Sequence, residues 1–454
     1  MDPILFWNEV ALEANRVSFT NGANEQPGPT LSSRALAIVH LAMYDAFAAV
    51  SGNPANLPAY LPGLPPVPPL STVEGAVAAA AYTTLTNLFP SQKMFFDKKI
   101  IEGGNSQDPG HEFGVKVGKM MLEDRKNDPG ISSDGYTPSP GVGKHDVDPD
   151  NSGQGFHAPF YGERSKCFAV TVRHKLDAPY PVGSTDYQKS LKQVLGNGIA
   201  PELMGTVPAG VNKRNAGETI VGVFWGYDGS KEIGTPPRLY NQIIRAIATA
   251  QANTPAENAR LFALVNVAMA DAGILSWEQK YRYEFWRPVI GIREDPTAPD
   301  TGWLPLGAPN SNKYDPKTKT GEKNFTPPFP AYPSGHATFG AAAFHVAELF
   351  YQVVRSGVDV AKNLKVVSDE LNGVNQDNKG TVRPKIEVTF TKGFKQMIEE
   401  NGFSRIYLGV HWSFDAFALN NAGKPDLTQN IGGVPLGINI ANDVFTHGMT
   451  KSIV

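Results

Sequence analysis

The apolar residues of this chain recur mainly with the period of helices. Between Ser33 and Ala49 they fall every three or four positions and form a wide face, as in a helix packed on one side. Ser32 or Ser33 is the expected N-cap of that helix. The same pattern predicts helices over residues 73–88, 91–103, 108–127, 216–227, 237–252, 255–275, 336–355 and 391–409. Strand patterns are few, with residues 168–172 the best candidate, so the predicted fold class is mainly α.

Long connectors separate these helices. The chain has 45 glycines and 37 prolines among 454 residues, well above ordinary usage of roughly 12%. They gather in residues 53–69, 128–159 and 295–333, and loops of such length inside a compact protein are often functional. Because 41% of the residues are hydrophobic, we interpret these loops as ordered. A weak break near residues 180–215 predicts two packed helical units, 1–200 and 201–454.

Composition excludes several function classes. Lys and Arg number 41 against 44 Asp and Glu, a net charge of −3, which argues against a general nucleic-acid binder. Cys167 is the only cysteine, so the chain has neither an intramolecular disulfide nor a cysteine-based metal site. The N-terminus shows no signal-peptide pattern, and no apolar window is long enough to predict a membrane span. We therefore expect a soluble protein, either cytoplasmic or secreted by another route.

The first chemical cluster is Lys280-Tyr-Arg-Tyr-Glu-Phe-Trp-Arg287-Pro288. Lys280 and Arg287 are seven positions apart, nearly two helical turns, so both cations are expected on one helical face that ends at Pro288. A basic stretch is usually a solvated surface. Here the neighbouring Trp277 and Trp286 favour burial instead, and buried cations need an anionic partner.

The second cluster is Pro333-Ser334-Gly335-His336, which leads into an apolar helix. A Ser-Gly pair before a helix offers a hydroxyl, free backbone N–H groups and the positive end of the helix dipole. Taken alone it also fits an ordinary serine N-cap.

The third cluster runs from Ser404-Arg405 through His411 to Asp415. Asp415 follows His411 by four residues, so on a helix its carboxylate would keep one imidazole nitrogen protonated and leave the other free to bind or attack. Arg405 adds a planar, bidentate donor. The three clusters together concentrate groups that bind an oxyanion.

In this order, Lys-x6-Arg-Pro, Pro-Ser-Gly-His and Ser-Arg-x5-His-x3-Asp, the sequence resembles the superfamily that unites vanadium-dependent haloperoxidases with type 2 phosphatidic acid phosphatases and bacterial acid phosphatases. Further segments resemble the fungal vanadium chloroperoxidases: residues 4–8, 33–45, 224–229, 234–237 and 329–339. This likeness covers most of the chain and is patchy between about residues 50 and 180.

The resemblance implies two four-helix bundles, with orthovanadate bound in the second. His411 would be the axial vanadium ligand, and His336 the acid–base residue. Phe329 and Trp277 would line the halide site, and Asp228 would brace Arg405. The groups implied to hold the vanadate oxygens are Lys280, Arg287, Ser334, Gly335 and Arg405, and Lys280 would also polarise peroxide. The substrates would be hydrogen peroxide and chloride or bromide, giving hypohalous acid that halogenates small organic acceptors.

Three alternatives stay open. In an acid phosphatase the same groups would serve, with His411 as nucleophile, Asp415 orienting it and His336 protonating the leaving group. A haloperoxidase restricted to bromide or iodide is the second alternative, and a catalytically inactive helical scaffold is the third. The sequence leaves open the organic acceptor and the oligomeric state.

Overall fold

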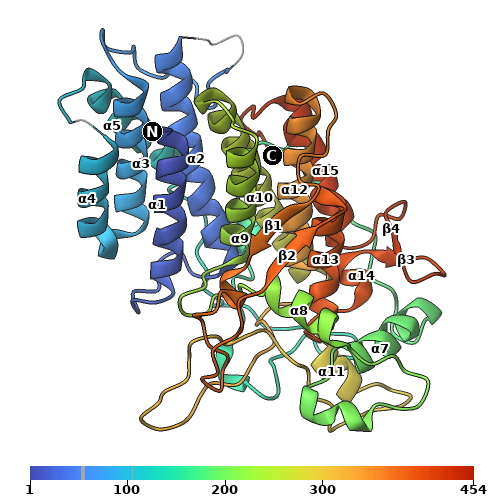
Figure 1. Ribbon diagram of the computed structural model, residues 1–454. Coiled ribbons are helices and arrows are strands. Elements are labelled where there is room, and N and C mark those ends of the chain that lie inside the picture. The colour runs from blue at the N-terminus through green and yellow to red at the C-terminus, as the bar shows by residue number, and fades with distance from the viewer. Residues whose placement is uncertain (53–56, 105) are drawn as a thin grey trace.

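The computed structural model describes residues 1–52, 57–104 and 106–454, and its helices form two groups (Figure 1). The first group consists of α1 (Pro3–Ser18), α2 (Gly28–Ser51), α3 (Val73–Leu88), α4 (Lys93–Gly103) and α5 (Pro109–Asp124). The second consists of α10 (Pro255–Tyr283), α12 (Gly335–Val354), α13 (Gly393–Tyr407) and α15 (Gly433–His447), flanked by α8 (Ala216–Phe224) and α9 (Pro236–Ala250). The groups join where α2 packs against α10. The mainly α prediction is confirmed, while the boundary near residue 200 stays a prediction.

Short elements cover one end of the second group. They are α6 (Tyr161–Arg164), α7 (Thr185–Asn197), α11 (Pro288–Arg293), α14 (Ser413–Ala416) and the 3-10 turns Ser152–Gln154, Pro201–Thr206 and Asp369–Leu371, whereas the 3-10 turn Pro90–Gln92 joins α3 to α4 in the first group. Two antiparallel pairs of strands complete the described chain: β1 (Leu364–Val367) with β2 (Glu387–Phe390), and β3 (Ala418–Leu419) with β4 (Pro425–Asp426). In the first pair Leu364 lies opposite Phe390.

Helix α10 is the central element because it is apolar on almost every side. Thr254 caps its first turn, and Glu257 returns a bond to the Thr254 backbone in a capping box. Small residues let its neighbours approach closely: a Cβ on Gly437 of α15 would lie 2.5 Å from the Thr338 carbonyl oxygen of α12. The interhelical core therefore places the start of α12 beside the end of α10.

The predicted strand at residues 168–172 is wrong. This segment is a bent loop, and its N–H groups at Phe168, Ala169 and Val170 donate to the Asp271 carboxylate at 2.5, 2.8 and 2.9 Å. A buried carboxylate on α10 thus takes the donors that a neighbouring strand would have needed.

The predicted serine N-cap of α2 is also wrong. The helix begins at Gly28, after Pro27, so Ser32 and Ser33 lie buried inside it. Ser32 Oγ instead accepts a hydrogen bond from Asn15 of α1 at 2.9 Å. The apolar pattern identified the helix but not its first turn, which proline and glycine begin.

The pattern missed three longer helices, α1, α7 and α15, and the short helices α6, α11 and α14. Helix α7 has few apolar residues, and α15 begins in a Gly-Gly-Val-Pro run that is typical of loops. Helix α10 also extends eight residues beyond the predicted end at 275. Of the predicted loop at 53–69, residues 53–56 lie outside the described residues.

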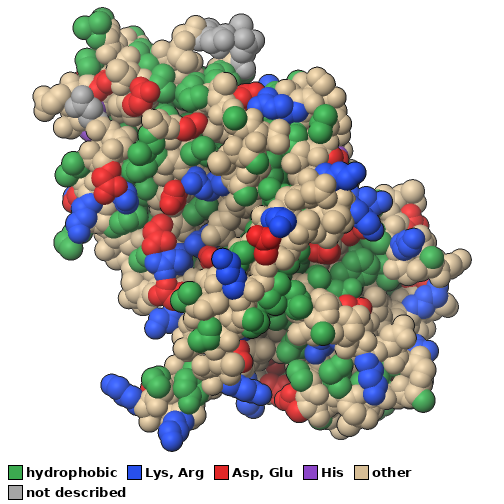
Figure 2. All heavy atoms as spheres, viewed as in Figure 1, with side chains coloured by type: hydrophobic (Ala, Val, Ile, Leu, Met, Phe, Trp, Pro, Cys, Tyr) green, Lys and Arg blue, Asp and Glu red, His purple; other side chains and the backbone are tan. Residues whose placement is uncertain are grey.

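Two helices, α2 and α10, have the length and composition of a membrane span. Their most apolar windows are 83% and 94% buried inside the protein, as expected of core helices. Figure 2 shows basic and acidic side chains interspersed over the visible face rather than gathered by sign. This distribution agrees with the small net charge of −3.

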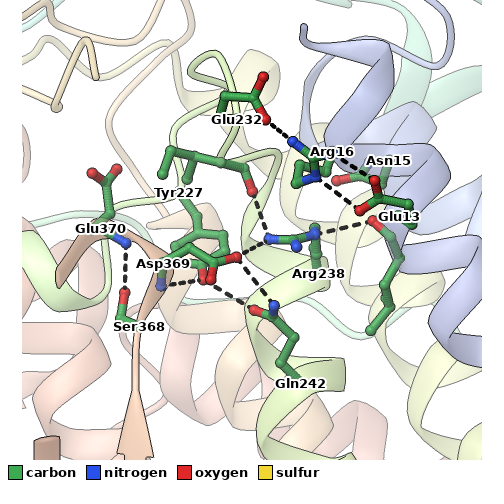
Figure 3. Close-up of polar contacts among 12 residues, drawn as sticks. Glu13, Asn15, Arg16, Tyr227, Glu232, Arg238, Gln242, Ser368, Asp369 and Glu370 are labelled. Atoms are coloured by element: carbon green, nitrogen blue, oxygen red, sulfur yellow. Dashed lines mark hydrogen bonds and ion pairs between the residues drawn. The ribbon is translucent and has the colours of Figure 1, made fainter. Parts of the chain in front are cut away.

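A polar network ties α1 to the loop before α9 and to the turn Asp369–Leu371 (Figure 3). Arg16 pairs with Glu232, and Arg238 pairs with Asp369. Arg238 Nε also donates to the Leu12 carbonyl at 3.0 Å. The network fixes the loop that leads into α9 from both helical groups.

Tyr227 is the strained member of this network. Its backbone φ is 49°, a left-handed value that is uncommon for a bulky residue. Its hydroxyl accepts from the Asp369 N–H at 2.8 Å and donates to Gln242 at 3.0 Å (Figure 3). These anchors hold the backbone immediately before Asp228.

Acid destabilisation is one expected consequence of the packing of α2. His40 is buried, with Nδ1 2.6 Å from the Leu36 carbonyl and Nε2 2.8 Å from Asn8 Nδ2. Because a carbonyl can only accept, Nδ1 carries the proton and Nε2 accepts from Asn8. Burial lowers the pKa of His40 from 6.5 to about 4.

The unfolded chain therefore takes up a proton below pH 6.5 that the folded chain refuses until about pH 4. The stability from neutral His40 is complete above pH 6.5 and falls as the pH drops toward 4, by roughly 2–3 kcal/mol. Urea unfolding at pH 7 and pH 4.5 should show a smaller loss of stability for H40Q than for wild type. H345Q, which replaces a partly exposed histidine, is the control, and an equal loss in H40Q and wild type would contradict the prediction.

Candidate active site

The three clusters converge at the inner end of the second helical group, although the first is arranged differently from the prediction. Helix α10 ends at Tyr283, and Glu284 adopts a left-handed φ of 49°. Arg287 consequently lies outside α10, as the N-cap residue of α11. The prediction that Lys280 and Arg287 share one helical face is wrong. The chain turn brings the two cations together instead, and both are fully buried.

His411 lies at the centre of a chain of buried hydrogen bonds. Its Nδ1 is 2.8 Å from Asp415 Oδ2, the same oxygen that accepts the Trp412 N–H at 2.9 Å. The carboxylate therefore fixes the proton on Nδ1, and Nε2 carries a lone pair. Arg287 Nη1 donates to that nitrogen at 2.9 Å and to the Val410 carbonyl at 2.7 Å. The predicted pairing of His411 with Asp415 is present, but the two residues do not share a helix, because His411 precedes α14, whose N-cap residue is Trp412.

Arg405 and Asp228 form a two-pronged ion pair deep in the site. Arg405 Nη1 and Nη2 lie 3.0 and 2.7 Å from the two carboxylate oxygens of Asp228. Arg405 comes from the last turn of α13, and Asp228 from the loop that Tyr227 anchors. The arrangement orients the guanidinium group, and its Nε has no hydrogen-bond partner in the described part of the chain.

His336 lies on the first turn of α12, beside the same loop. Its Nε2 is 2.7 Å from the Gly226 carbonyl, so Nε2 carries the proton in the neutral ring. Its Nδ1 makes no hydrogen bond with any described residue and is free to accept a proton. Asp228 Oδ1 lies 3.8 Å from Nε2.

Ser334 caps α12 as predicted, with the Ala337 N–H 3.4 Å from its hydroxyl oxygen. Its own N–H donates to the Asp415 carbonyl at 2.7 Å, which ties the cap to α14. Gly335 opens the helix, so its N–H has no carbonyl one turn earlier. A Cβ there would lie 3.2 Å from the ring of Trp277, so glycine lets the indole pack against the helix start.

Lys280 points toward the chain beneath this helix start. Its Nζ donates to the carbonyls of Pro330 and Ala331 at 2.9 and 3.1 Å, and also to Pro333. These three bonds use all three ammonium hydrogens. Lys280 therefore braces the segment before Ser334 and contributes its charge to the site from below.

A cavity of about 380 Å³ opens onto the cluster. At the cluster its lining includes Asp228, Gly335, His336, Arg405 and His411. Its aromatic wall includes Trp277 and Phe329, whose ring centroids are 4.7 Å apart. Lys280, Arg287 and Ser334 lie behind this surface. The structure thus brings the predicted residues together, with some on the cavity wall and others supporting it.

Burial governs the ionisation of the site. It lowers the pKa of Arg287 to about 9, with Arg405 nearby adding to the effect. It also lowers the pKa values of Lys280, His336 and His411 well below their usual ranges. Both histidines are therefore neutral at neutral pH.

Burial raises the pKa of Asp415 to about 7 and that of Asp228 above its usual value. Even without the two neutral histidines, the basic side chains of the site are three, Lys280, Arg287 and Arg405, against the two carboxyl groups of Asp228 and Asp415.

The donors left unpaired describe what the site can hold. Arg287 Nη2 and Arg405 Nε are buried without a partner among the described residues, and the lone pair of His411 Nε2 lies beside them, where it accepts from Arg287 Nη1. Together with the free N–H of Gly335, they form a cradle for a compact oxyanion with one nitrogen ligand. This donor set fits a tetrahedral oxyanion such as vanadate or phosphate. The sequence did not predict His157, which also lines the cavity. It lies in a loop 120 positions before Trp277, and no sequence pattern links residues so far apart.

The comparisons agree with this architecture. The family model of the vanadium chloroperoxidase N-terminal domain matches residues 1–167. The model of the second helical-bundle domain of the same family (VCPO) matches residues 260–426. A vanadium chloroperoxidase from Curvularia inaequalis is 36% identical, over 98% of this chain and 90% of its own length.

Among solved structures, a bacterial vanadium-dependent iodoperoxidase superposes with a TM-score of 0.66 at 20% identity, covering 97% of this chain and 95% of its own. An apo-type bacterial vanadium-dependent chloroperoxidase gives a TM-score of 0.63 at 14% identity, covering 92% and 94%. At these identities the structural likeness establishes the fold.

Proposed function

Because the chain belongs to the vanadium haloperoxidase family, whose cofactor is vanadate, we propose that it oxidises both chloride and bromide with hydrogen peroxide at the buried cation cluster. The hypohalous acid formed would leave and halogenate small organic acceptors. The observation that carries the proposal is the set of unpaired donors around His411 Nε2 at the inner end of the cavity. Such a set has no structural use without an anion, because unpaired buried donors cost stability.

In the proposed site, His411 Nε2 would bind the vanadium once its hydrogen bond from Arg287 Nη1 is released. Arg287, Arg405, Ser334 and Gly335 hold the vanadate oxygens, and Lys280 contributes charge through the segment that it braces. A direct contact from Lys280 would require it to release one of its three carbonyls. When bound, vanadate supplies a Lewis acid that activates peroxide without a change of oxidation state.

His336 is the proposed acid–base group. Its Nε2 proton is committed to the Gly226 carbonyl, so Nδ1 is the atom that accepts a proton from hydrogen peroxide. Because the ring is neutral, it is ready to act as a base before the reaction. The protonated ring then returns the proton as the oxidised halide leaves.

Trp277 and Phe329 are proposed to form the halide wall. Two aromatic rings 4.7 Å apart exclude water from one side of the cavity, which removes hydration from a small anion beside the cations. Phe329 gives this wall its second apolar ring, beside that of Trp277. This apolar wall supports activity with chloride as well as bromide.

Halide oxidation by metal-stripped protein, before and after addition of orthovanadate, tests this function. We expect vanadate to restore peroxide-dependent halogenation of a dye with both chloride and bromide. Activity with bromide alone would overturn the assignment of the wall. If vanadate restores no halide oxidation and only inhibits phosphate-ester cleavage, the acid phosphatase interpretation replaces the proposal.

A further inference from the structure

His157 is placed at the aromatic wall by its own backbone. Its N–H donates to the Pro328 carbonyl at 2.7 Å, one residue before Phe329. Its carbonyl accepts from Tyr281 Oη at 2.7 Å and from Trp277 Nε1 at 3.3 Å. The backbone of His157 is therefore hydrogen-bonded directly to Trp277 and to Pro328, the residue before Phe329.

The imidazole ring itself joins the wall. Its centroid lies 6.0 Å from the Trp277 ring and 6.1 Å from the Phe329 ring, and it lines the cavity. On its other side it packs against the start of α2. A Cβ on Gly28 would lie 2.4 Å from the ring, so only glycine leaves room for the imidazole there. The ring is held between the two helical groups.

Thr30 determines which ring nitrogen carries the proton. Its hydroxyl lies 3.2 Å from His157 Nε2, and the described residues offer the hydroxyl hydrogen no other acceptor. Nε2 therefore accepts from Thr30. Burial lowers the pKa of His157 to about 4, so the ring is neutral and its single proton resides on Nδ1. No described residue forms a hydrogen bond with that Nδ1–H.

We propose that His157 donates its Nδ1–H to the halide and so determines the preference of the enzyme for small halides. This inference rests on the proposed function. The aromatic rings of the wall provide only weakly polar edges, and Trp277 Nε1 is already committed to the His157 carbonyl. Chloride has a higher charge density than iodide, so it depends more on a conventional N–H donor.

Halide binding and turnover by H157F, T30V and T30S test this role. Chloride binding is measured as ³⁵Cl NMR line broadening by vanadate-loaded enzyme without peroxide, and KM values are measured for chloride and iodide. For H157F we expect chloride binding to weaken about tenfold and its KM to rise equally, because a hydrogen bond to a charged group is lost. The KM for iodide should change by less than about twofold. T30V should shift the same values by about threefold, and T30S should match wild type, because serine retains the hydroxyl.

Unchanged chloride binding in folded H157F, or equal changes for both halides, would overturn the inference. If H157F does not fold, the comparison of T30V with T30S decides it. Wild-type protein that binds chloride through His157 but oxidises no halide would support the contact and overturn the proposed function. The two failures are therefore distinguishable.

Discussion

Replacing His411 with alanine is expected to reduce vanadate-dependent halide oxidation by on the order of a thousandfold, the scale of losing one essential member of a catalytic group. His411 Nε2 is the nitrogen that lies beside the unpaired arginine donors, so removing the imidazole removes the proposed bond to vanadium. The protein should still fold, because Asp415 keeps its bond to the Trp412 N–H. The measurement is kcat/KM for bromide with saturating vanadate.

Two further variants show whether the loss comes from ligation. D415N retains the shape of the side chain but no longer fixes the proton on His411 Nδ1, so we expect a loss of about ten- to a hundredfold. H345A removes a histidine that also pairs with a carboxylate, Glu348, but lies outside the cavity lining. It should keep wild-type activity. Full vanadate-dependent activity in folded H411A would contradict the proposed ligand.

Replacing Asp228 with alanine is expected to give the largest loss of stability among the site variants. Arg405 is fully buried, and its two-pronged pair with Asp228 is its only carboxylate contact among the described residues. Removing one partner of a buried ion pair leaves an uncompensated charge, at a cost of about 3–5 kcal/mol. The free energy of unfolding in urea, measured without vanadate, gives the size of this effect.

Added orthovanadate should recover part of the stability of D228A, because an anion that binds only the folded state compensates the buried charge of Arg405. D97N breaks a solvent-exposed ion pair with Lys93 and should leave the unfolding free energy unchanged. If D228A matched D97N in stability, Arg405 would not depend on Asp228, and the ion pair would have no energetic role.

The sequence predicted which residues form the cluster better than it predicted how they are arranged. Ser334 could be predicted because a cap position is a local property of a helix. The pair of His411 with Asp415 could be predicted because the two residues are only four positions apart, although His411 precedes α14 rather than sharing a helix with Asp415. Lys280 and Arg287 were assigned to one helical face because the pattern could not show that Glu284 turns left-handed and ends α10. The two cations still lie together, because backbone carbonyls outside α10 accept their hydrogen bonds: those of Pro330 and Ala331 for Lys280, and that of Val410 for Arg287.

Other parts of the site depend on long-range packing. The loop that carries Asp228 is anchored by Arg238, Asp369 and Tyr227, which lie up to 142 residues apart along the chain. His157 enters the wall through backbone bonds to residues more than a hundred positions later. No local period records such contacts, so the structure was needed to place these residues.

The most direct measurement is a titration of metal-stripped protein with orthovanadate, in which bound vanadium and chloride oxidation are determined in the same samples. The account predicts that activity rises from zero in proportion to bound vanadium and saturates at one vanadium per chain, and that H411A neither binds vanadium tightly nor gains activity. Chloride oxidation without vanadium, or vanadium bound one per chain in H411A with wild-type affinity, would contradict it.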